Sequence, residues 1–449
     1  MNKQGIQRVH FIGIGGIGMS ALARYYQSRG VQVTGYDRTP SPLTAQLEKE
    51  GMAIHYEDNP NLLPALLDAA VYTPAVPQDL KELAELRRRG VPLRKRAEAL
   101  GDLSKAHYTI AVAGTHGKTT TTAMVAHILH ENGVDMTAFI GGIANNFDSN
   151  IHLGRTEEAV LVVEADEFDR SFLQLSPDIS IVNAIDADHL DIYGNEQQVV
   201  SSFNDFAKLT RHCVISKETL PLNIGESVRH MRFGFDKEND FRAVDIRQHE
   251  GETDFNIESQ DAVTPVHLKM AGIHNVLNAT AAFAATLELG LEARGIAEAL
   301  ATFRGVKRRF DVRIKNASHC YIDDYAHHPE EIKSCLSAIK ASFPSKRLTL
   351  VFQPHLFTRT RDFMEDFATT LAMADDLILL DIYPAREKPI EGISSQALLD
   401  KIHNPHKCLC PNERLLDLID ERKPELLVTM GAGSIDRFVE PLQTMISQW

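Results

Sequence analysis

The stretch AVAGTHGKTTTTAM, residues 111–124, decides the fold of the chain. Its small and β-branched residues predict a short buried strand, which runs into a glycine-rich turn and then into a helix. This order builds a phosphate-binding loop, because backbone N–H groups at a helix N-terminus point at phosphate oxygens. Lys118 would then reach the β- and γ-phosphates of a nucleotide, and the Thr119 hydroxyl could ligate Mg²⁺.

One position departs from the common spacing of such loops. The pattern Gly-x-x-x-x-Gly-Lys-Ser/Thr would place a glycine at position 112, where the sequence has Val112. The alternative is a structural turn in which Gly114 and Gly117 only interrupt regular structure. We favour the phosphate loop, because the strand, the Gly-Lys-Thr turn and the helix follow one another in the required order.

A second glycine-rich turn stands near the start of the chain. RVHFIGI, residues 8–14, predicts a strand, and GIGGIGM, residues 13–19, has the spacing Gly-x-Gly-x-x-Gly before a predicted helix. Asp37 ends the next predicted strand, as in dinucleotide sites. The same N–H groups could hold NAD(P) or another diphosphate, such as that of a nucleotide sugar. Two phosphate-type loops imply two phosphorylated ligands, which favours a transferase or ligase over a dehydrogenase.

Two acidic clusters end buried strands in the middle of the sequence. In VVEADEFD, residues 162–169, Glu164 is the first candidate Mg²⁺ ligand and Asp166 the second, because Mg²⁺ prefers oxygen donors at a strand end beside a phosphate loop. The alternative is an exposed acidic loop. DADHLD, residues 186–191, is a similar cluster, in which His189 is either a solvated loop residue or a functional one.

The last third of the chain predicts another α/β unit. DDYAHHP, residues 323–329, and FQPHLFTRTRD, residues 352–362, each follow an apolar strand. Arg359 and Arg361 in the second motif could clamp a carboxylate or a phosphate. The basic segment RGVKRRFD, residues 304–311, precedes them. Each basic cluster could also be an ordinary surface patch.

Bulk composition limits the classes of protein that the chain can be. A length of 449 residues suggests roughly three domains, and the charged stretch 81–100 reads as a solvated surface helix and turn near a domain border. The net charge of −14 argues against nucleic acid as a partner. No apolar run is long enough to span a membrane. Five cysteines without CxxC pairs favour the reducing cytoplasm.

Taken together, the motifs resemble the Mur ligase family. The phosphate loop of that family is Gly-Thr-x-Gly-Lys-Thr-Thr, and GTHGKTT, residues 114–120, matches it fully and so accounts for Val112. The resemblance continues nearly end to end, through GIGGIGM, EADE, DADHLD, HNVLNA, DDYAHHP and FQPHLFTRTR. It implies an α/β chain of three domains. These are a Rossmann-like UDP-sugar-binding domain (1–105), a central P-loop ATPase-type domain (106–312) and a C-terminal Rossmann-like domain that receives the amino acid (313–449).

The resemblance also implies a reaction. It is the ADP-forming ligation of L-alanine to the lactyl carboxylate of UDP-N-acetylmuramate through an acyl phosphate, with ATP and Mg²⁺, in peptidoglycan precursor synthesis. We expect a monomer or a homodimer with small-molecule partners and no membrane partner. The alternatives are a tripeptide ligase of the same family, used in murein recycling, a non-catalytic nucleotide-binding regulator, and an NAD(P)-dependent oxidoreductase. The last would leave GTHGKTT without a purpose.

Four groups of site residues are carried over from the family. The catalytic group is Lys118, Glu164, His189 and Arg309, and the Mg²⁺ ligands are Thr119, Glu164 and His189. ATP binding is assigned to Gly114, Thr115, His116, Gly117, Lys118, Thr119, Thr120, His274, Asn278 and Asp324. UDP-sugar binding is assigned to Gly15, Gly16, Ile17, Gly18, Asp37 and Thr73. The amino-acid side is assigned to Tyr325, His328, His355 and Arg359, where Tyr325 would help to select alanine.

Three positions differ from the family pattern. Phe168 stands where serine is usual, Ala326 where glycine is usual, and Leu356 where an arginine is usual. The last removes a positive charge near the substrates, for which Arg359, Arg361 or Arg386 could compensate.

Overall fold

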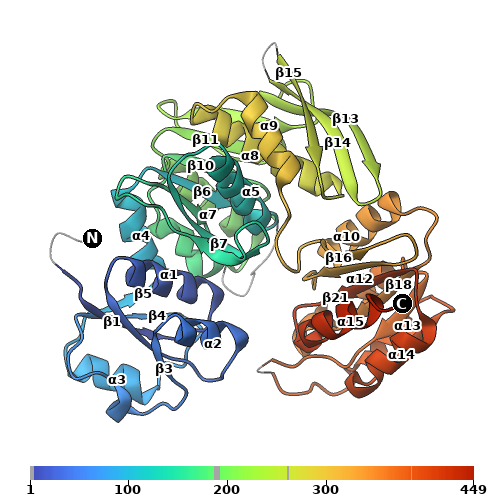
Figure 1. The fold of residues 1–449 in the computed structure, drawn as a ribbon, viewed down its shortest axis with the longest axis horizontal. Coiled ribbons are helices and arrows are strands. Elements are labelled where there is room, and N and C mark those ends of the chain that lie inside the picture. The colour runs from blue at the N-terminus through green and yellow to red at the C-terminus, as the bar shows by residue number, and fades with distance from the viewer. Residues whose placement is uncertain (1–4, 187–192, 260–261, 386) are drawn as a thin grey trace. The chain divides into compact units, whose positions relative to one another are not determined.

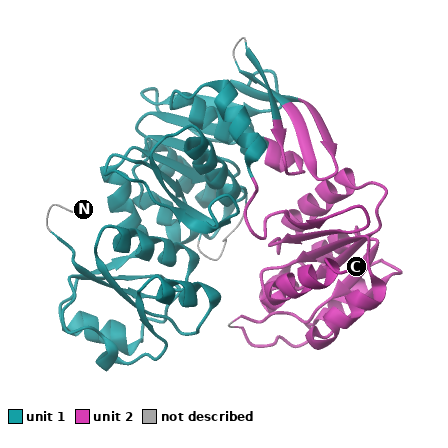
Figure 2. Cartoon of the chain, viewed as in Figure 1, with its two compact units in different colours: residues 1–244, 256–266, 277–303 teal, residues 245–255, 267–276, 304–449 magenta. Residues whose placement is uncertain are grey.

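The computed structural model describes residues 5–186, 193–259, 262–385 and 387–449. The chain forms two compact units, one of residues 1–244, 256–266 and 277–303 and the other of residues 245–255, 267–276 and 304–449 (Figure 2). It contains three separate β-sheets with helices packed on them (Figure 1). The predicted α/β class with three domains is confirmed. No helix in the described part of the chain has the length and apolar character needed to cross a bilayer.

The first sheet is parallel and has the order β3-β2-β1-β4-β5. Its strands are β1 (Arg8–Ile12), β2 (Gln32–Tyr36), β3 (Ala53–His55), β4 (Ala69–Tyr72) and β5 (Leu93–Lys95). Its helices are α1 (Ile17–Ser28), α2 (Pro42–Lys49), η1 (Pro60–Leu62), α3 (Lys81–Arg88) and α4 (Arg96–Ala106). The strand order reverses between β1 and β4, and ligands of such sheets bind at the carboxyl ends of the strands that flank this point.

The stretch 81–100 is more than the solvated surface helix that the sequence suggests. It is divided into α3, β5 and the start of α4, and the leucines of α3, Leu83 and Leu86, are fully buried. Its arginine-rich face is exposed as expected, since Arg88 keeps most of its side chain in solvent. The many charged residues of the segment gave no sign of these leucines, which form an apolar stripe that packs on the first sheet.

The central sheet has ten strands in the order β15-β14-β13-β12-β11-β10-β6-β9-β7-β8. They are β6 (Thr109–Ala113), β7 (Met136–Ala144), β8 (Ser149–His152), β9 (Val160–Glu164), β10 (Ile179–Val182), β11 (Cys213–Lys217), β12 (Arg229–Gly234), β13 (Phe241–His249), β14 (Glu252–Ser259) and β15 (Ala262–Leu268). The associated helices are α5 (Lys118–Glu131), η2 (Phe168–Gln174), α7 (Glu196–Lys208), α8 (Ile273–Glu288) and α9 (Ala293–Thr302). All five residues of β6 are buried, as expected for a parallel strand covered on both faces.

The third sheet has the order β16-β17-β21-β18-β19-β20, in which only the pairing of β16 with β17 is antiparallel. Its strands are β16 (Asp311–Lys315), β17 (Cys320–Asp324), β18 (Leu348–Phe352), β19 (Asp376–Leu379), β20 (Lys407–Leu409) and β21 (Leu426–Met430). Its helices are α10 (Pro329–Ser342), α11 (Phe357–Asp362), α12 (Met364–Leu371), α13 (Ser395–Lys401), η3 (Asn412–Arg414), α14 (Leu415–Arg422), η4 (Ser434–Phe438) and α15 (Val439–Ile446). The carboxyl ends of β17, β21 and β18 therefore meet at one edge.

The packing of α4 on η2 depends on Gly101. A Cβ at this position would lie 2.4 Å from the backbone oxygen of Gln174, which cannot rotate away as a side chain can. We expect Gly101→Ala to lower the free energy of unfolding by about 1–3 kcal/mol, the usual cost of overpacking. Urea unfolding followed by circular dichroism measures the change. Gly225→Ala is the matched control, because a Cβ there meets no atom within 4 Å. Equal stability of the two variants would contradict this account.

Candidate functional site

Three loops far apart in sequence meet at one edge of the central sheet. The phosphate-type loop follows β6, the acidic run that begins at Glu164 follows β9, and the segment 183–186 follows β10. Because β10, β6 and β9 are adjacent and parallel, their carboxyl ends lie side by side. The topology of the sheet thus assembles the site that the motifs predict.

The two glycines of the loop are required by its geometry. Gly114 and Gly117 have φ angles of 135° and 81°, which disfavour residues with a Cβ. A Cβ at Gly117 would also lie 2.4 Å from Asn278 Oδ1. The Thr115 N–H donates to the Ala184 carbonyl at 3.0 Å, which fixes the loop to the segment after β10. The loop is therefore a built cradle at the N-terminus of α5 and not a chance run of small residues.

Lys118 is held by a carboxylate that the sequence analysis did not single out. Its Nζ donates to both oxygens of Glu167, at 2.9 and 2.7 Å, and to the Gly114 carbonyl at 2.7 Å. The side chains of Lys118 and Glu167 are only 13% and 2% exposed. Burial alone would lower the pKa of Lys118, but the carboxylates of Glu167, Glu164 and Asp166 raise it above its usual range. The ammonium group therefore stays charged inside the site.

Oxygen donors face each other beside this lysine. The Thr119 hydroxyl donates to Glu164 Oε1 at 3.1 Å, and Glu164 Oε2 accepts the Gly141 N–H at 2.9 Å. The carboxylates of Glu164, Asp166 and Glu167 thus crowd a loop built for phosphate. A hydroxyl and a carboxylate in contact, with surplus negative charge around them, are a donor set that fits Mg²⁺.

The first glycine-rich loop is fixed by Asp37. The Gly15 N–H donates to Asp37 Oδ2 at 2.7 Å, so the acid that follows β2 contacts the loop itself. Gly13 has a φ of 82°, and a Cβ there would lie 2.9 Å from Thr73 Cγ2, at the switch point between β1 and β4. The predicted residues Gly16, Ile17, Gly18 and Thr73 line one pocket of about 320 Å³.

That pocket also reaches the acidic end of β9. Besides the first loop, its lining includes Arg96, Glu164 and Asp166. Arg96 Nη2 lies 3.5 Å from Asp166 Oδ2, and a Cβ at Gly18 would lie 2.8 Å from Arg96 Nη1. Arg96 belongs to the stretch 81–100, which the sequence predicts to be solvated. Its position as the first residue of α4 is the one sequence signal that could have identified it as a site residue. Arg96 is the basic side chain among the residues that line this pocket.

In the second unit, two arginines lie over one tyrosine ring. The guanidinium carbons of Arg308 and Arg309 are 5.1 and 5.3 Å from the centroid of Tyr325. Arg308 Nε also donates to Asp323 Oδ2 at 3.1 Å. Burial raises the pKa of Asp323 to about 6. The predicted residues Arg309 and Tyr325 are therefore neighbours within a cationic, aromatic cluster.

Asp324 has a structural part in the same loop. Its Oδ2 accepts the Phe310 N–H and its Oδ1 the Ala326 N–H, both at 2.7 Å. With both oxygens engaged, Asp324 orders the turn that carries Tyr325. Ala326 stands at the position where glycine is expected. It is buried and its φ angle is not positive, so the turn does not need glycine there.

The predicted pair His355 and Arg359 is brought into contact. Arg359 Nη1 lies 3.2 Å from His355 Nδ1, and the His355 ring stacks on Tyr383 with a centroid distance of 5.7 Å. Leu356 has a φ of 74° and donates its N–H to the Tyr383 carbonyl at 3.0 Å. Arg361 pairs with Asp362 on the exposed side, so Arg359 is the arginine of this motif that lies next to His355.

The remaining predicted residues are placed separately. His189 and Arg386 lie outside the described residues. His274 and Asn278 share α8, where His274 Nδ1 is 3.1 Å from Ser334 Oγ and Asn278 adjoins Gly117. His116 Nε2 is 3.4 Å from Asp186 Oδ2. Thr120 is buried in α5, and the His328 ring packs on Phe363 at 4.6 Å.

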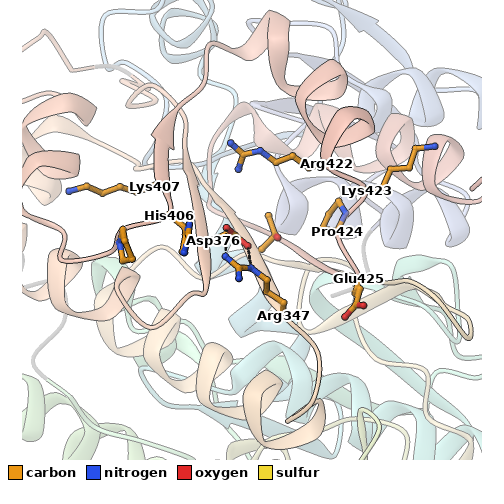
Figure 3. A pocket seen from close by; sticks show the side chains of 10 residues that line it. Arg347, Asp376, His406, Lys407, Arg422, Lys423, Pro424 and Glu425 are labelled. Atoms are coloured by element: carbon orange, nitrogen blue, oxygen red, sulfur yellow. Dashed lines mark hydrogen bonds and ion pairs between the residues drawn. The ribbon is translucent and has the colours of Figure 1, made fainter.

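Another hollow, of about 640 Å³, is rich in basic side chains (Figure 3). Arg347 and Asp376 form an ion pair in it, with Lys407 and Arg422 on its lining. These residues precede β18, begin β19 and β20 and precede β21, so the hollow lies at the amino ends of the strands. Tyr325 and His355 follow the carboxyl ends of β17 and β18, which makes the hollow a separate feature.

Three stretches of the chain match sequence families. Residues 8–108 match the Mur ligase family, catalytic domain; residues 112–286 match the Mur ligase middle domain; residues 308–433 match the Mur ligase, glutamate ligase domain. A UDP-N-acetylmuramate–L-alanine ligase of Cytophaga hutchinsonii is 45% identical over 100% of this chain and 98% of its own length. One of Christiangramia forsetii is 46% identical over 98% of this chain and 97% of its own length.

Two solved structures are similar over nearly the whole length. A UDP-N-acetylmuramate–alanine ligase of Thermotoga maritima has a TM-score of 0.82 and 30% identity, covering 97% of this chain and 99% of its own. A murein peptide ligase of Psychrobacter arcticus has a TM-score of 0.71 and 24% identity, covering 99% of both chains. At this identity the likeness shows the fold alone.

The surroundings of His355 make folding sensitive to acid. Burial, followed by the charges of Arg359 and His327, lowers the pKa of His355 from 6.5 to about 4, although Glu387 opposes the shift. The unfolded chain therefore binds a proton at this residue below pH 6.5 that the folded chain does not bind until about pH 4, so stability falls as the pH is lowered through this window.

We expect His355→Gln to lose less of its melting temperature than the original protein between about pH 7.5 and about pH 5. Differential scanning fluorimetry at both pH values measures this. The exposed His403 gives the control variant His403→Gln, which should behave like the original protein. An unchanged pH dependence in His355→Gln would show that the acid sensitivity comes from other groups.

Proposed function

The chain belongs to the Mur ligase family, whose members are ATP-dependent ligases, and we propose that it joins L-alanine to the lactyl carboxylate of UDP-N-acetylmuramate. The products are ADP, phosphate and an amide. The chain is 45% identical over its full length to a UDP-N-acetylmuramate–L-alanine ligase, and this identity supports the assignment over the tripeptide ligase. The reaction would serve the synthesis of peptidoglycan precursors.

One geometric observation carries the proposal. A single pocket is lined by the glycine-rich loop of the first sheet and by Glu164 and Asp166, which stand beside the phosphate loop. A sugar nucleotide held by its diphosphate at Gly16–Gly18 would direct its other end towards the γ-phosphate site at Lys118. An oxidoreductase would have no use for this connection between two phosphate loops.

The first chemical step is a phosphoryl transfer. A carboxylate oxygen of the muramoyl group attacks the γ-phosphorus of ATP, the bond to the bridging oxygen breaks, and ADP leaves with the electron pair. Lys118 would leave Glu167 to bind the β- and γ-phosphates, and the loop N–H groups would hold the same oxygens. Arg96, next to the first loop, is suited to guide the anionic substrate.

The second step makes the amide. The neutral amine of L-alanine attacks the acyl carbon, loses its proton, and phosphate leaves from the tetrahedral intermediate with the bonding electron pair. No protein nucleophile is needed, so the chain contributes position and charge neutralisation. We assign Tyr325, His328, His355 and Arg359 to the amino-acid side and Arg309 to the nucleotide phosphates, supported by the contacts of Arg309 with Tyr325 and of Arg359 with His355.

The proposed reaction includes Mg²⁺ as a cofactor. Thr119 and Glu164 would hold it, with His189 as a further ligand carried over from the family. The bound ion would neutralise charge on the transferring phosphate. We further propose the domain borders 1–105, 106–312 and 313–449, and a cytoplasmic location, which suits five cysteines that are all free thiols.

Phosphate release tests the function directly. With ATP, Mg²⁺ and UDP-N-acetylmuramate present, we expect phosphate and ADP to appear on addition of L-alanine and not of the tripeptide. Lys118→Ala should lower the rate by at least about a hundredfold, because it removes a charge aimed at the transferring phosphoryl group. UDP-sugar binding, followed by calorimetry, should be nearly unchanged in that variant. Release with the tripeptide alone would move the assignment to the recycling enzyme.

Glu167 competes with the nucleotide for Lys118. The ammonium group must leave two carboxylate oxygens to reach ATP, and a hydrogen bond to a charged group contributes about 1.5–3 kcal/mol. We expect Glu167→Gln to tighten ATP binding roughly tenfold, or about 1.4 kcal/mol. Calorimetry with MgATP measures it, and Glu157→Gln, at an exposed position, controls for net charge. Weaker binding in Glu167→Gln would mean that Glu167 orients the lysine for phosphate.

A further inference from the structure

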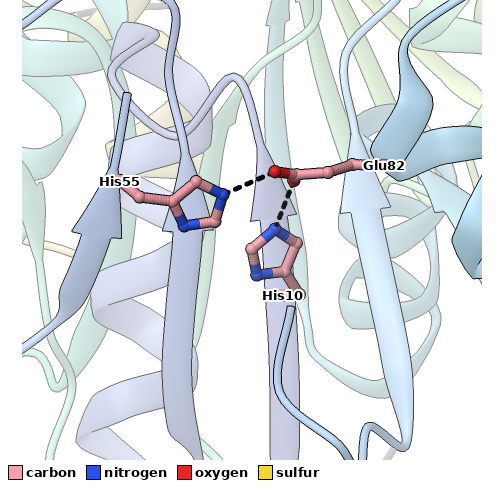
Figure 4. Close-up of side chains that lie close together, drawn as sticks. All are labelled: His10, His55 and Glu82. Carbon is pink, nitrogen blue, oxygen red and sulfur yellow. Dashed lines mark hydrogen bonds and ion pairs between the residues drawn. The ribbon is translucent and has the colours of Figure 1, made fainter. Parts of the chain in front are cut away.

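Two histidines and a glutamate converge inside the first sheet, and none of them belongs to a substrate loop. His10 lies in β1, His55 ends β3 and Glu82 lies in the first turn of α3 (Figure 4). One ligand atom from each residue can be chosen so that all three lie within 4.8 Å of one another. The three side chains thus bring together parts of the chain 27 to 72 residues apart.

Both imidazoles point at the same carboxylate. His10 Nε2 lies 3.3 Å from Glu82 Oε2, and His55 Nε2 lies 2.6 Å from Glu82 Oε1. The side chains of His10 and Glu82 are fully buried, and that of His55 is 18% exposed. Among the described residues, the ion pairs formed by Glu82 are with these two histidines. Within the described part of the chain, the buried carboxylate therefore has histidines and no lysine or arginine as its ion-pair partners.

A surrounding set of hydrogen bonds fixes the cluster. His10 Nδ1 is 2.8 Å from Thr34 Oγ1, and the Asn59 N–H donates to Glu82 Oε1 at 3.2 Å. The backbone N–H of Glu82 donates to Asp58 Oδ1 at 3.0 Å, which anchors the start of α3. Histidines that bind metals carry such a partner on their second ring nitrogen, which orients the ring and sets the tautomer.

The distances and atom types suit a transition metal. Two imidazole nitrogens and a carboxylate oxygen form a set that Zn²⁺ takes with an open fourth position. Bonds of about 2.0–2.2 Å in a tetrahedron leave neighbouring ligand atoms roughly 3.3–3.5 Å apart. The His10–Glu82 separation already has this value. The closer His55 would have to withdraw slightly, and it ends a three-residue edge strand with part of its ring in solvent.

We propose that His10, His55 and Glu82 bind one divalent transition metal ion, with Zn²⁺ as the ion whose preferred ligands they supply. The ion would join β1, β3 and α3, and so stabilise the first sheet. It is separate from the Mg²⁺ assigned to the phosphate loop, which Thr119, Glu164 and His189 would hold. An ion that binds only the folded chain raises its melting temperature, and the rise grows with the logarithm of the free ion concentration once that exceeds Kd.

The test uses the full chain, treated with a chelator and then dialysed. Calorimetric titration with Zn²⁺, in excess Mg²⁺ to occupy oxygen-rich sites, should give one equivalent of tight binding and a higher melting temperature. Co²⁺ should bind at the same place and give the visible absorption of a tetrahedral ion. Glu82→Gln should weaken Zn²⁺ binding at least about a hundredfold and abolish the metal-dependent rise in melting temperature.

Two further variants keep the test decisive. His55→Gln should lose the binding as Glu82→Gln does, and its partial exposure makes it the variant that preserves the fold if the buried glutamate cannot be replaced. His267→Gln is the matched control, because His267 lies 2.8 Å from Asp254 and 3.5 Å from Glu252 in a separate, exposed cluster. The proposal is overturned if the original protein takes up no stoichiometric Zn²⁺, if His55→Gln binds it unchanged, or if His267→Gln is the variant that loses it.

Discussion

Parallel pairing of β6 with β9 and β10 is the constraint on which the candidate site depends. A parallel sheet places the carboxyl ends of adjacent strands at one edge, so the loops that follow them must meet. The glycine-rich loop lies so close to the segment after β10 that a Cβ at Gly114 would be 2.9 Å from the Ala184 nitrogen. Strand register thus sets the distance between the phosphate loop and the acids that serve it.

The balance of charge around Lys118 is the second feature that shapes the site. Glu164, Asp166 and Glu167 lie around Lys118, and Arg96 pairs with Asp166 at 3.5 Å. A phosphate could not approach three carboxylates without compensation, because like charges at short range repel strongly in a poorly hydrated site. The surplus of acids therefore favours a metal ion as part of the functional assembly, and it explains why the lysine is paired with Glu167.

In the second unit, charged side chains contact an aromatic ring and backbone N–H groups. Arg308 and Arg309 lie over the Tyr325 ring, while Asp324 uses both carboxylate oxygens on backbone N–H groups. The first arrangement keeps positive charge near an aromatic surface, and the second fixes the turn that presents it. Leu356 carries no charge, and Arg359 lies 3.2 Å from His355, so this motif keeps one cation beside the histidine.

The sequence by itself determined the α/β class, the two glycine-rich loops and the choice of Asp37, Thr119 and Glu164 as candidate residues near them. These features follow from short-range patterns, since the spacing of glycines, apolar residues and acids dictates local geometry. Only the tertiary structure decided the roles of Glu167, Arg96 and the cluster of His10, His55 and Glu82. Each of these contacts joins segments that are not adjacent in sequence, and strand order, which no local pattern encodes, brings them together.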